Sequence, residues 1–326
     1  MFSRHLLAAL ALALPALAQR PDNTSICDFY TTALLKNNTG ENQYTLLTLL
    51  VNTVVIGNYS EVNTGVKVPG ILAEGEFDGT KVNLLPYFNG DLKSTNRGGN
   101  VGVSVNFLDS GGAEPLMNNK PANDEKSQQF FLLTHLYQFF GSLLGCSQYS
   151  MPGFPAYGGD PSMYQAHKFM DLDPSELGYF IQQVALSAQS FGVAEADITA
   201  VGKALSSLFN VRCAPPTEVI PGGGVQLQSI CIAGACPVAE NDTCQCYAAA
   251  VEPGEMIPAG QMGQMGGECA VGGSGGMGGN NGSTMPTSTS AGPAEPTEIT
   301  QPGAASVNSL GLGALALVGF SMFITL

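Results

Sequence analysis

Residues 173–192 read DPSELGYFIQQVALSAQSFG and carry the clearest structural signal in the chain. Asp173 is placed to cap a helix, Pro174 suits the first helical position, and Glu176 completes a capping box with Asp173. Apolar side chains then recur at helical spacing until Gly192, where we expect the helix to end. The predicted buried face consists of Leu177, Phe180, Ile181, Val184, Ala188 and Phe191. This segment predicts a long amphipathic helix.

Three more segments have helical spacing. A helix over about 195–211 is expected next, and the strongly apolar residues 130–144 predict one upstream. The apolar stripe predicted there consists of Phe130, Leu133, Leu136, Phe140 and Leu143. Another helix is expected to start after Ser25. Residues 45–56 are largely apolar, a pattern that fits either a helix or a buried strand.

Residues 66–108 have a different pattern. Asp78-Gly79 lies between two short runs and predicts a tight hairpin. Apolar residues alternate with small or polar ones over 101–107, which predicts a strand. The fold class we expect is therefore mainly α, with a helical domain over 19–213 and a β-containing insertion at about 36–110.

Both ends of the chain predict export and anchoring. Residues 1–18 have the charge, apolar run and small-residue cleavage site of a signal peptide. At the other end, residues 304–326 carry no charge and consist of a short polar break followed by an apolar tail over 310–326, as in a propeptide replaced by a glycosylphosphatidylinositol (GPI) anchor. Gly303 is the preferred attachment site, with Ala304 and Ser290 as alternatives. A membrane-spanning helix is the other interpretation of each apolar run.

Composition supports an extracellular protein with a stalk. Residues 214–303 are rich in Gly, Pro, Ser, Thr and Met, which predicts a disordered spacer between the domain and the membrane. The net charge of −14 argues against nucleic acid as a partner. Glycosylation sequons begin at Asn23, Asn37, Asn58, Asn241 and Asn281. We expect the mature chain to be anchored in the outer leaflet of the plasma membrane and to contact cell-wall glycan. Its acidic composition, sequons and anchor signal together resemble those of fungal surface proteins.

Eight cysteines fit an oxidising compartment. Three lie in residues 19–213 and five lie beyond, so full pairing requires at least one bridge between the two regions. The downstream cysteines are Cys231, Cys236, Cys244, Cys246 and Cys269. Their spacing lacks paired C-x-x-C and has no accompanying histidine, which favours disulfides over zinc. The connectivity stays open at this point.

Few residues offer catalytic chemistry. Of three histidines, His5 falls in the predicted signal peptide, which leaves His135 and His167. The sequence contains neither a G-x-S-x-G elbow nor an H-E-x-x-H pair, which argues against serine hydrolases and zinc proteases of those types. Carboxylates at Asp171, Asp173 and Glu176 are mostly explained by the helix start at residue 174.

A family resemblance rests on residues 127–213. Residues 139–145 read FFGSLLG, residues 157–168 read YGGDPSMYQAHK, and two predicted helices follow. This order resembles that of truncated haemoglobins, in which an apolar distal helix precedes a Tyr-Gly loop, a short Met-x-x-x-His turn and two long helices. The resemblance implies a globin-like fold and haem as the cofactor.

The same resemblance implies roles for single residues. His167 would be the proximal ligand of the haem iron and hence the metal ligand. Tyr30, in a segment similar to the family's early helix, would donate a hydrogen bond to a bound ligand. Phe88 would stack on the haem.

The remaining implied positions lie on the distal helix. His135 would lie near the haem edge, within reach of a propionate. Leu132 and Leu136 occupy positions where the family often has polar distal groups. Phe140 would line the apolar face of the pocket, which keeps water from the porphyrin.

The expected function is haem binding at the cell surface, with a diatomic ligand or redox chemistry. Nitric-oxide dioxygenation or a peroxidase-like reaction is what the resemblance implies for an enzyme, and the enzyme class stays open. The alternatives are a non-catalytic adhesion or cell-wall protein that kept the helical fold, and a scavenger that passes haem on.

Overall fold

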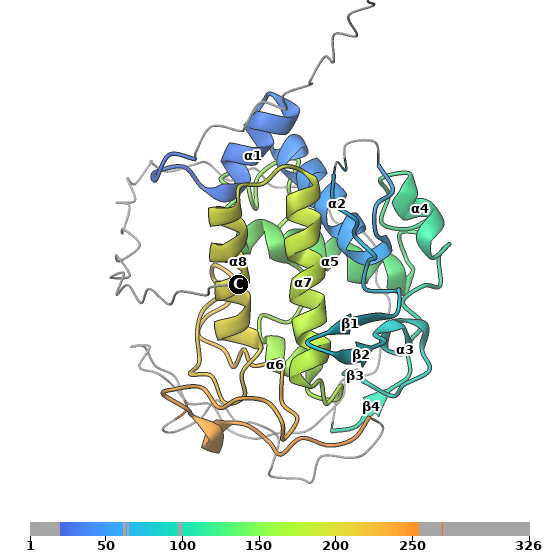
Figure 1. Ribbon diagram of the computed structural model, residues 1–326, viewed down its shortest axis with the longest axis vertical. Helices are drawn as coiled ribbons and strands as arrows, with labels where there is room; N and C mark the ends of the chain where they lie inside the picture. Colours follow the sequence, from blue (N-terminus) through green and yellow to red (C-terminus); the bar gives the residue numbers. More distant parts are fainter. Residues whose placement is uncertain (1–19, 61–62, 64, 97–99, 254–268, 270–326) are drawn as a thin grey trace, which may run out of the picture. The chain divides into compact units, whose positions relative to one another are not determined.

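A computed structural model describes residues 20–60, 63, 65–96, 100–253 and 269 (Figure 1). The described residues are mainly helical, which confirms the predicted class. The helices are α1 (Ile26–Leu35), α2 (Gly40–Ile56), α3 (Leu85–Asn89), α4 (Ala113–Met117), α5 (Gln128–Leu143), α6 (Met163–His167), α7 (Pro174–Ser190) and α8 (Glu195–Phe209). The predicted signal peptide and anchor propeptide, with the three candidate attachment residues, lie outside the described residues.

Capping side chains fix where the helices begin. The Asp173 carboxylate accepts hydrogen bonds from the backbone N–H groups of Ser175 and Glu176, both at 2.8 Å. The Glu176 carboxylate in turn accepts from the Asp173 N–H at 3.0 Å, so the predicted capping box is confirmed. Ser25 caps α1 as expected. Thr39 caps α2, a helix that includes the ambiguous residues 45–56.

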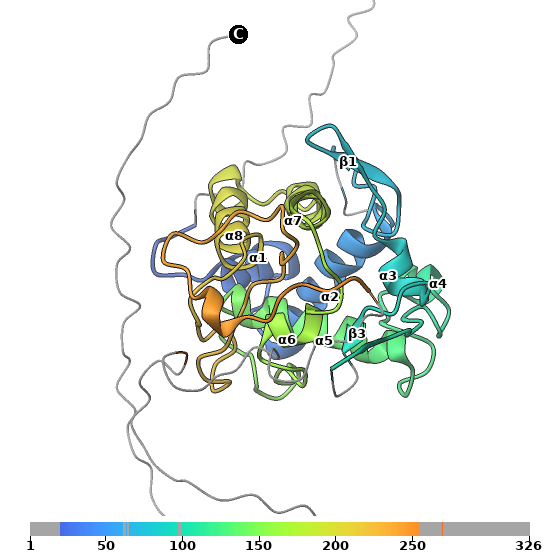
Figure 2. The ribbon, with the colours of Figure 1, turned by 90° about the horizontal axis from the view of Figure 1, so that it is seen from below.

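The long helices pack into one connected bundle. α7 and α8 lie side by side and antiparallel, and α2 packs against both α5 and α7 (Figures 1 and 2). Helix α1 packs on α2. The most deeply buried side chains between these helices include Leu47, Leu133, Tyr137, Phe154 and Tyr179. Their burial supplies the hydrophobic stabilisation of the domain.

The β structure is confined to two short pairs. β1 (Gly75–Phe77) and β2 (Thr80–Val82) form the predicted hairpin, and both turn residues, Asp78 and Gly79, have positive φ as a type I′ turn requires. β3 (Thr95–Asn96) pairs with β4 (Gly102–Val103).

The strand predicted over 101–107 is mostly wrong, because only Gly102–Val103 pairs as a strand. Its later residues bond to the α3 region instead. The Ser104 hydroxyl donates to the Gly90 carbonyl, and the Phe107 N–H donates to the Phe88 carbonyl.

Residues 214–253 differ from the stalk expected there. They fold against the helices, with Ile220, Leu227 and Cys231 almost fully buried. The N–H of Cys231 donates to the carbonyl of Phe209 at 2.8 Å, which ties this segment to the end of α8. The disordered-stalk interpretation is therefore wrong for these forty residues, and the rest of 214–303 lies outside the described residues except Cys269.

Disulfides explain how a Gly- and Pro-rich segment can be ordered. The pairs are Cys27–Cys146, Cys213–Cys244, Cys231–Cys236 and Cys246–Cys269. Cys213–Cys244 is the required bridge between the two regions. Cross-links reduce the entropy of the unfolded chain, so less apolar burial is needed for order. Four disulfides are compatible with a secreted protein. Among the described residues, no helix has the length and apolarity needed to cross a bilayer.

Candidate functional site

The proximal candidate His167 is the last residue of the short helix α6. Ser162 caps this helix by accepting the N–H of Gln165, and its hydroxyl donates to the carbonyl of Leu227 at 2.7 Å. The Nδ1 atom of His167 lies 2.7 Å from the carbonyl oxygen of Met163, one turn earlier. A carbonyl can only accept, so Nδ1 carries the proton and Nε2 keeps a lone pair.

Burial favours the same neutral form. It lowers the pKa of His167, against a smaller opposing effect of the bond to Met163. A neutral imidazole whose second nitrogen donates to a backbone carbonyl is the state in which histidine usually ligates a metal. His167 therefore has the chemistry that axial ligation of haem iron needs.

A buried lysine adjoins this histidine. Lys168 is only 4% exposed, and its ammonium donates to the Gln165 side chain at 2.8 Å. The same nitrogen lies 5.2 Å from the centroid of the Phe169 ring, in cation–π range. Burial lowers the pKa of Lys168. Sequence reasoning missed this residue, because a lone lysine is ordinarily exposed and no local pattern marks it as buried.

His135 lies on α5, half-buried beside the loop that precedes α6. Its ring centroid is 5.5 Å from that of Tyr157, and burial lowers its pKa. Leu132 and Leu136 on α5, and Phe88 on α3, are partly buried and pack against the main core.

Tyr30 has a different environment from the one that the resemblance implies. Its hydroxyl donates to the Asp197 carboxylate at 2.8 Å and accepts the N–H of Ala194 at 2.9 Å. Arg20 closes the network by donating from Nε and Nη2 to the other oxygen of Asp197, at 3.0 and 2.8 Å. Burial is the main cause that raises the pKa of Tyr30. Sequence reasoning missed Arg20 and Asp197, which are 177 residues apart.

This network lies far from α6 along the bundle. Ala194 and Asp197 are at the connection between α7 and α8, whereas α6 lies near the opposite end of α7 (Figure 1). Helix α7 has 17 residues, a length of about 25 Å at 1.5 Å per residue. The structure does not bring Tyr30 and His167 together.

Tyr30 and Phe140 instead share an apolar cavity. It lies between α1, α2, α5, α7 and α8 and has a volume of about 40 Å³. Pockets for drug-sized ligands and cofactors occupy about 300–1,000 Å³, so this enclosed space is too small for haem. The five other predicted site residues are not among those that line it: Phe88, Leu132, His135, Leu136 and His167.

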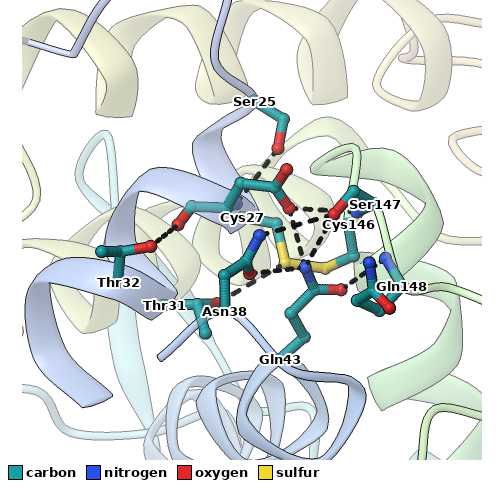
Figure 3. Close-up of a disulfide and its surroundings, with 10 residues drawn as sticks. Ser25, Cys27, Thr31, Thr32, Asn38, Gln43, Cys146, Ser147 and Gln148 are labelled. Carbon is teal, nitrogen blue, oxygen red and sulfur yellow. Dashed lines mark hydrogen bonds between the residues drawn. A yellow bond between two sulfur atoms is a disulfide. The ribbon is translucent and has the colours of Figure 1, made fainter. Parts of the chain in front are cut away.

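A disulfide and a buried glutamine position α1 at this cavity (Figure 3). Cys27 on α1 is bonded to Cys146, just beyond α5. The Gln43 side chain on α2, fully buried, donates to the Asp28 carboxylate at 2.7 Å and accepts the Gln148 N–H at 2.9 Å. These contacts fix α1, and with it Tyr30, against α2 and the end of α5.

The predicted residues thus divide between two places. The tautomer and neutral state of His167 are those that a metal-ligating histidine needs, whereas the cavity beside Tyr30 and Phe140 is too small for haem. Within the described part of the chain, no cluster of three or more His, Cys, Asp or Glu residues is arranged to hold a metal ion. Comparison of the chain with protein families, with curated proteins and with solved structures finds no match.

Proposed function

We propose that this chain is an extracellular haem-binding protein in which Nε2 of His167 ligates the iron. The observation that carries the proposal is the 2.7 Å contact between Nδ1 of His167 and the Met163 carbonyl. It assigns the proton to Nδ1 and leaves Nε2 ready to bind a metal. Haem, when bound, would supply the site for a diatomic ligand or for electron transfer.

Further support comes from the order of elements. Helices α5, α6, α7 and α8 follow one another in the order that the truncated-haemoglobin resemblance implies. The aromatic ring of Phe169 comes two residues after His167 and is fully buried. A porphyrin needs apolar walls that exclude water, and Phe169 would contribute one such side chain.

We place the distal side of the haem elsewhere than at Tyr30. The Tyr30 hydroxyl already bonds Asp197 and Ala194, so it is engaged in structure. A ligand on the iron would therefore be held without this tyrosine, and we assign no reaction to the site.

We also propose GPI anchoring in the outer leaflet, on the grounds of the two chain ends described above. The test is treatment of intact cells with a phosphatidylinositol-specific phospholipase C. Release of the protein into the medium would support the anchor. Retention on the cells, while a known GPI protein is released, would contradict it.

The second candidate function is a non-catalytic protein of the cell surface or wall. It is favoured by the way the Cys213–Cys244 bridge and the buried Ile220 and Leu227 hold residues 214–253 against the helices. A cross-linked domain of this kind would suit adhesion or a structural role. A haem scavenger, which binds the cofactor only to pass it on, is a variant of the first proposal.

A haemin titration of the secreted, disulfide-intact protein tests the proposal. We expect a stoichiometric Soret band that His167→Ala abolishes or shifts and that the matched His135→Ala variant keeps. Slow loss of haem to apomyoglobin would favour ligand or redox chemistry, and fast loss would favour scavenging. A folded wild-type protein that gives no Soret band would refute haem binding and leave the structural role.

A further inference from the structure

The glycosylation sequons have no part in the haem proposal. An N-linked sugar needs an asparagine at the start of an Asn-x-Ser or Asn-x-Thr triplet, and in the folded protein that asparagine must reach solvent. The sequon at Asn281 lies outside the described residues. In the described sequons every first residue is exposed: Asn23, Asn37, Asn58 and Asn241. The fold therefore leaves room for a bulky substituent at each of them.

The side-chain nitrogen of each of these asparagines is free. In the described structure none of them donates a hydrogen bond from Nδ2, the atom to which an N-linked sugar is attached. Outside the sequons, most described asparagines donate from Nδ2 to a protein acceptor. Further examples are Asn42, Asn52, Asn96, Asn118, Asn123 and Asn210. Glycosylation at the described sequons would thus break no hydrogen bond of the fold.

Two adjacent residues between α1 and α2 show the contrast directly. Asn38 accepts a hydrogen bond from the buried Gln43 side chain at 2.7 Å and belongs to the polar network around that side chain (Figure 3). In the described structure the side chain of Asn37 makes no hydrogen bond, whereas its backbone carbonyl accepts from the Asn42 side chain at 2.8 Å. The backbone at Asn37 is therefore held in place while its amide group is exposed.

Asn58 combines a structural contact with a free nitrogen. Its Oδ1 accepts the N–H of Val68 at 2.6 Å, and its own N–H donates to the Val68 carbonyl at 3.1 Å. Both hydrogen bonds use atoms that a glycosylated asparagine keeps, because the sugar replaces only one hydrogen on Nδ2. A glycan on Asn58 would therefore be compatible with the contact that closes the loop from Asn58 to Val68.

We propose that Asn23, Asn37, Asn58 and Asn241 carry N-linked oligosaccharides. In the transfer step Nδ2 attacks C1 of the first sugar of a lipid-linked oligosaccharide diphosphate. A C–N bond forms while the bond from C1 to the diphosphate oxygen breaks, and the proton lost from Nδ2 leaves with the lipid diphosphate. The step takes place in the secretory pathway, so the proposal rests on export of the chain and is independent of haem.

The first test maps the modified positions on the protein secreted from a eukaryotic host. The protein is treated with peptide N-glycosidase in heavy-oxygen water, which converts each glycosylated asparagine into a labelled aspartate that mass spectrometry locates. We expect the label at all four proposed positions. Asn106 is the matched control, because it is exposed but begins no sequon, and it should stay unlabelled.

A second test uses variants. Asn37→Gln should raise the electrophoretic mobility by one step that glycosidase treatment removes, whereas Asn106→Gln should not. Thr39→Ser should keep the glycan, because serine supplies the hydroxyl that both the sequon and the cap of α2 need. Thr39→Val removes this hydroxyl and should lose the label at Asn37 alone.

Three results would count against the proposal. Absence of label from all four positions, in a secreted protein with its disulfides intact, would overturn it. Label at only some of them would overturn the assignment at the others. Equal label at Asn106 would show spontaneous deamidation and would remove the evidence for a glycan. A protein that binds no haem can still give the expected labels, so failure of the haem proposal is recognised separately.

Discussion

Substitution of Tyr30 by phenylalanine separates a structural role from a role in ligand binding. The change removes one hydroxyl and keeps the ring, which is 2% exposed. Two hydrogen bonds disappear, one to the Asp197 carboxylate and one from the Ala194 N–H. A hydrogen bond to a charged group contributes about 1.5–3 kcal/mol, and a buried donor left unpaired costs about 1–3 kcal/mol.

Water partly solvates this network, because the side chain of Arg20 is 23% exposed and that of Asp197 is 8% exposed. The free-energy cost of losing the two hydrogen bonds is therefore smaller than the two ranges added together. We therefore expect Tyr30→Phe to lower the free energy of unfolding by about 2–3 kcal/mol. In a domain of this size that corresponds to a fall in Tm of about 4–12 °C. Asp197→Ala should cost more, about 3–5 kcal/mol, because it leaves the Arg20 guanidinium without its carboxylate.

The assay is urea unfolding of the disulfide-intact protein, followed by circular dichroism. Glu195→Ala is the control, since this exposed carboxylate is in the same first turn of α8 and should change stability by no more than about 0.5 kcal/mol. Tyr30→Phe should also leave the Soret spectrum of the haem-loaded protein unchanged. Unaltered stability together with a shifted spectrum would refute the structural role and restore Tyr30 as a distal residue.

Three further predictions concern packing, pH and cross-linking. Gly141→Ala would place a Cβ about 2.1 Å from the ring of the fully buried Phe154, so we expect a loss of about 1–3 kcal/mol in urea unfolding; unchanged stability would contradict the contact. Burial lowers the pKa of His135 in the folded state, so the unfolded state binds a proton more readily. The free energy of unfolding is therefore unaffected by His135 above pH 6.5 and declines as the pH falls below that value. His135→Gln should flatten this pH dependence below pH 6.5. Replacing Cys213 and Cys244 together by serine opens a link spanning 31 residues and should cost about 3–4 kcal/mol, with proteolysis beginning in residues 214–253; equal protease resistance would argue against the fold of that segment.

Local signals in the sequence predicted local structure. Ser25 and Asp173 were recognisable as caps because a cap depends on backbone groups only two or three residues away. The Asp78-Gly79 pair predicted the hairpin for the same reason, since the turn depends on the φ angles of these two residues. Such interactions leave a readable pattern in neighbouring residues.

Apolar periodicity was less informative about which face of a helix is buried. The predicted stripe on α5 included Phe130 and Leu143, which are only partly buried, whereas Gln129 and Tyr137 are fully buried. The hydroxyl of Tyr137 donates to Asn52 at 2.6 Å, and the amide of Gln129 donates to backbone carbonyls. Buried polar groups are tolerated when they are hydrogen-bonded. A count of apolar residues overlooks them.

The prediction of a disordered stalk was wrong over residues 214–253 for a different reason. The composition of residues 214–253 indicates a chain with too little apolar surface to offset its ordering entropy. That reasoning treats the chain as uncross-linked, but Cys213–Cys244 and Cys231–Cys236 remove much of the entropy of the unfolded state. Cysteine pairing therefore has to be considered before composition is used to assign disorder.

The same distinction between local and long-range contacts explains the candidate site. The bond from His167 to Met163 spans one turn, so a Met-x-x-x-His motif contains all of its information. The environment of Tyr30 depends on Asp197, which is 167 residues away, and no sequence pattern near Tyr30 indicates that partner. A resemblance that is good over residues 127–213 can therefore support the proximal side of a haem site, whereas the distal side has to come from the fold. In this fold the Tyr30 hydroxyl serves the junction of α1 with α8, so under the haem proposal a distal group would come from elements closer to α6.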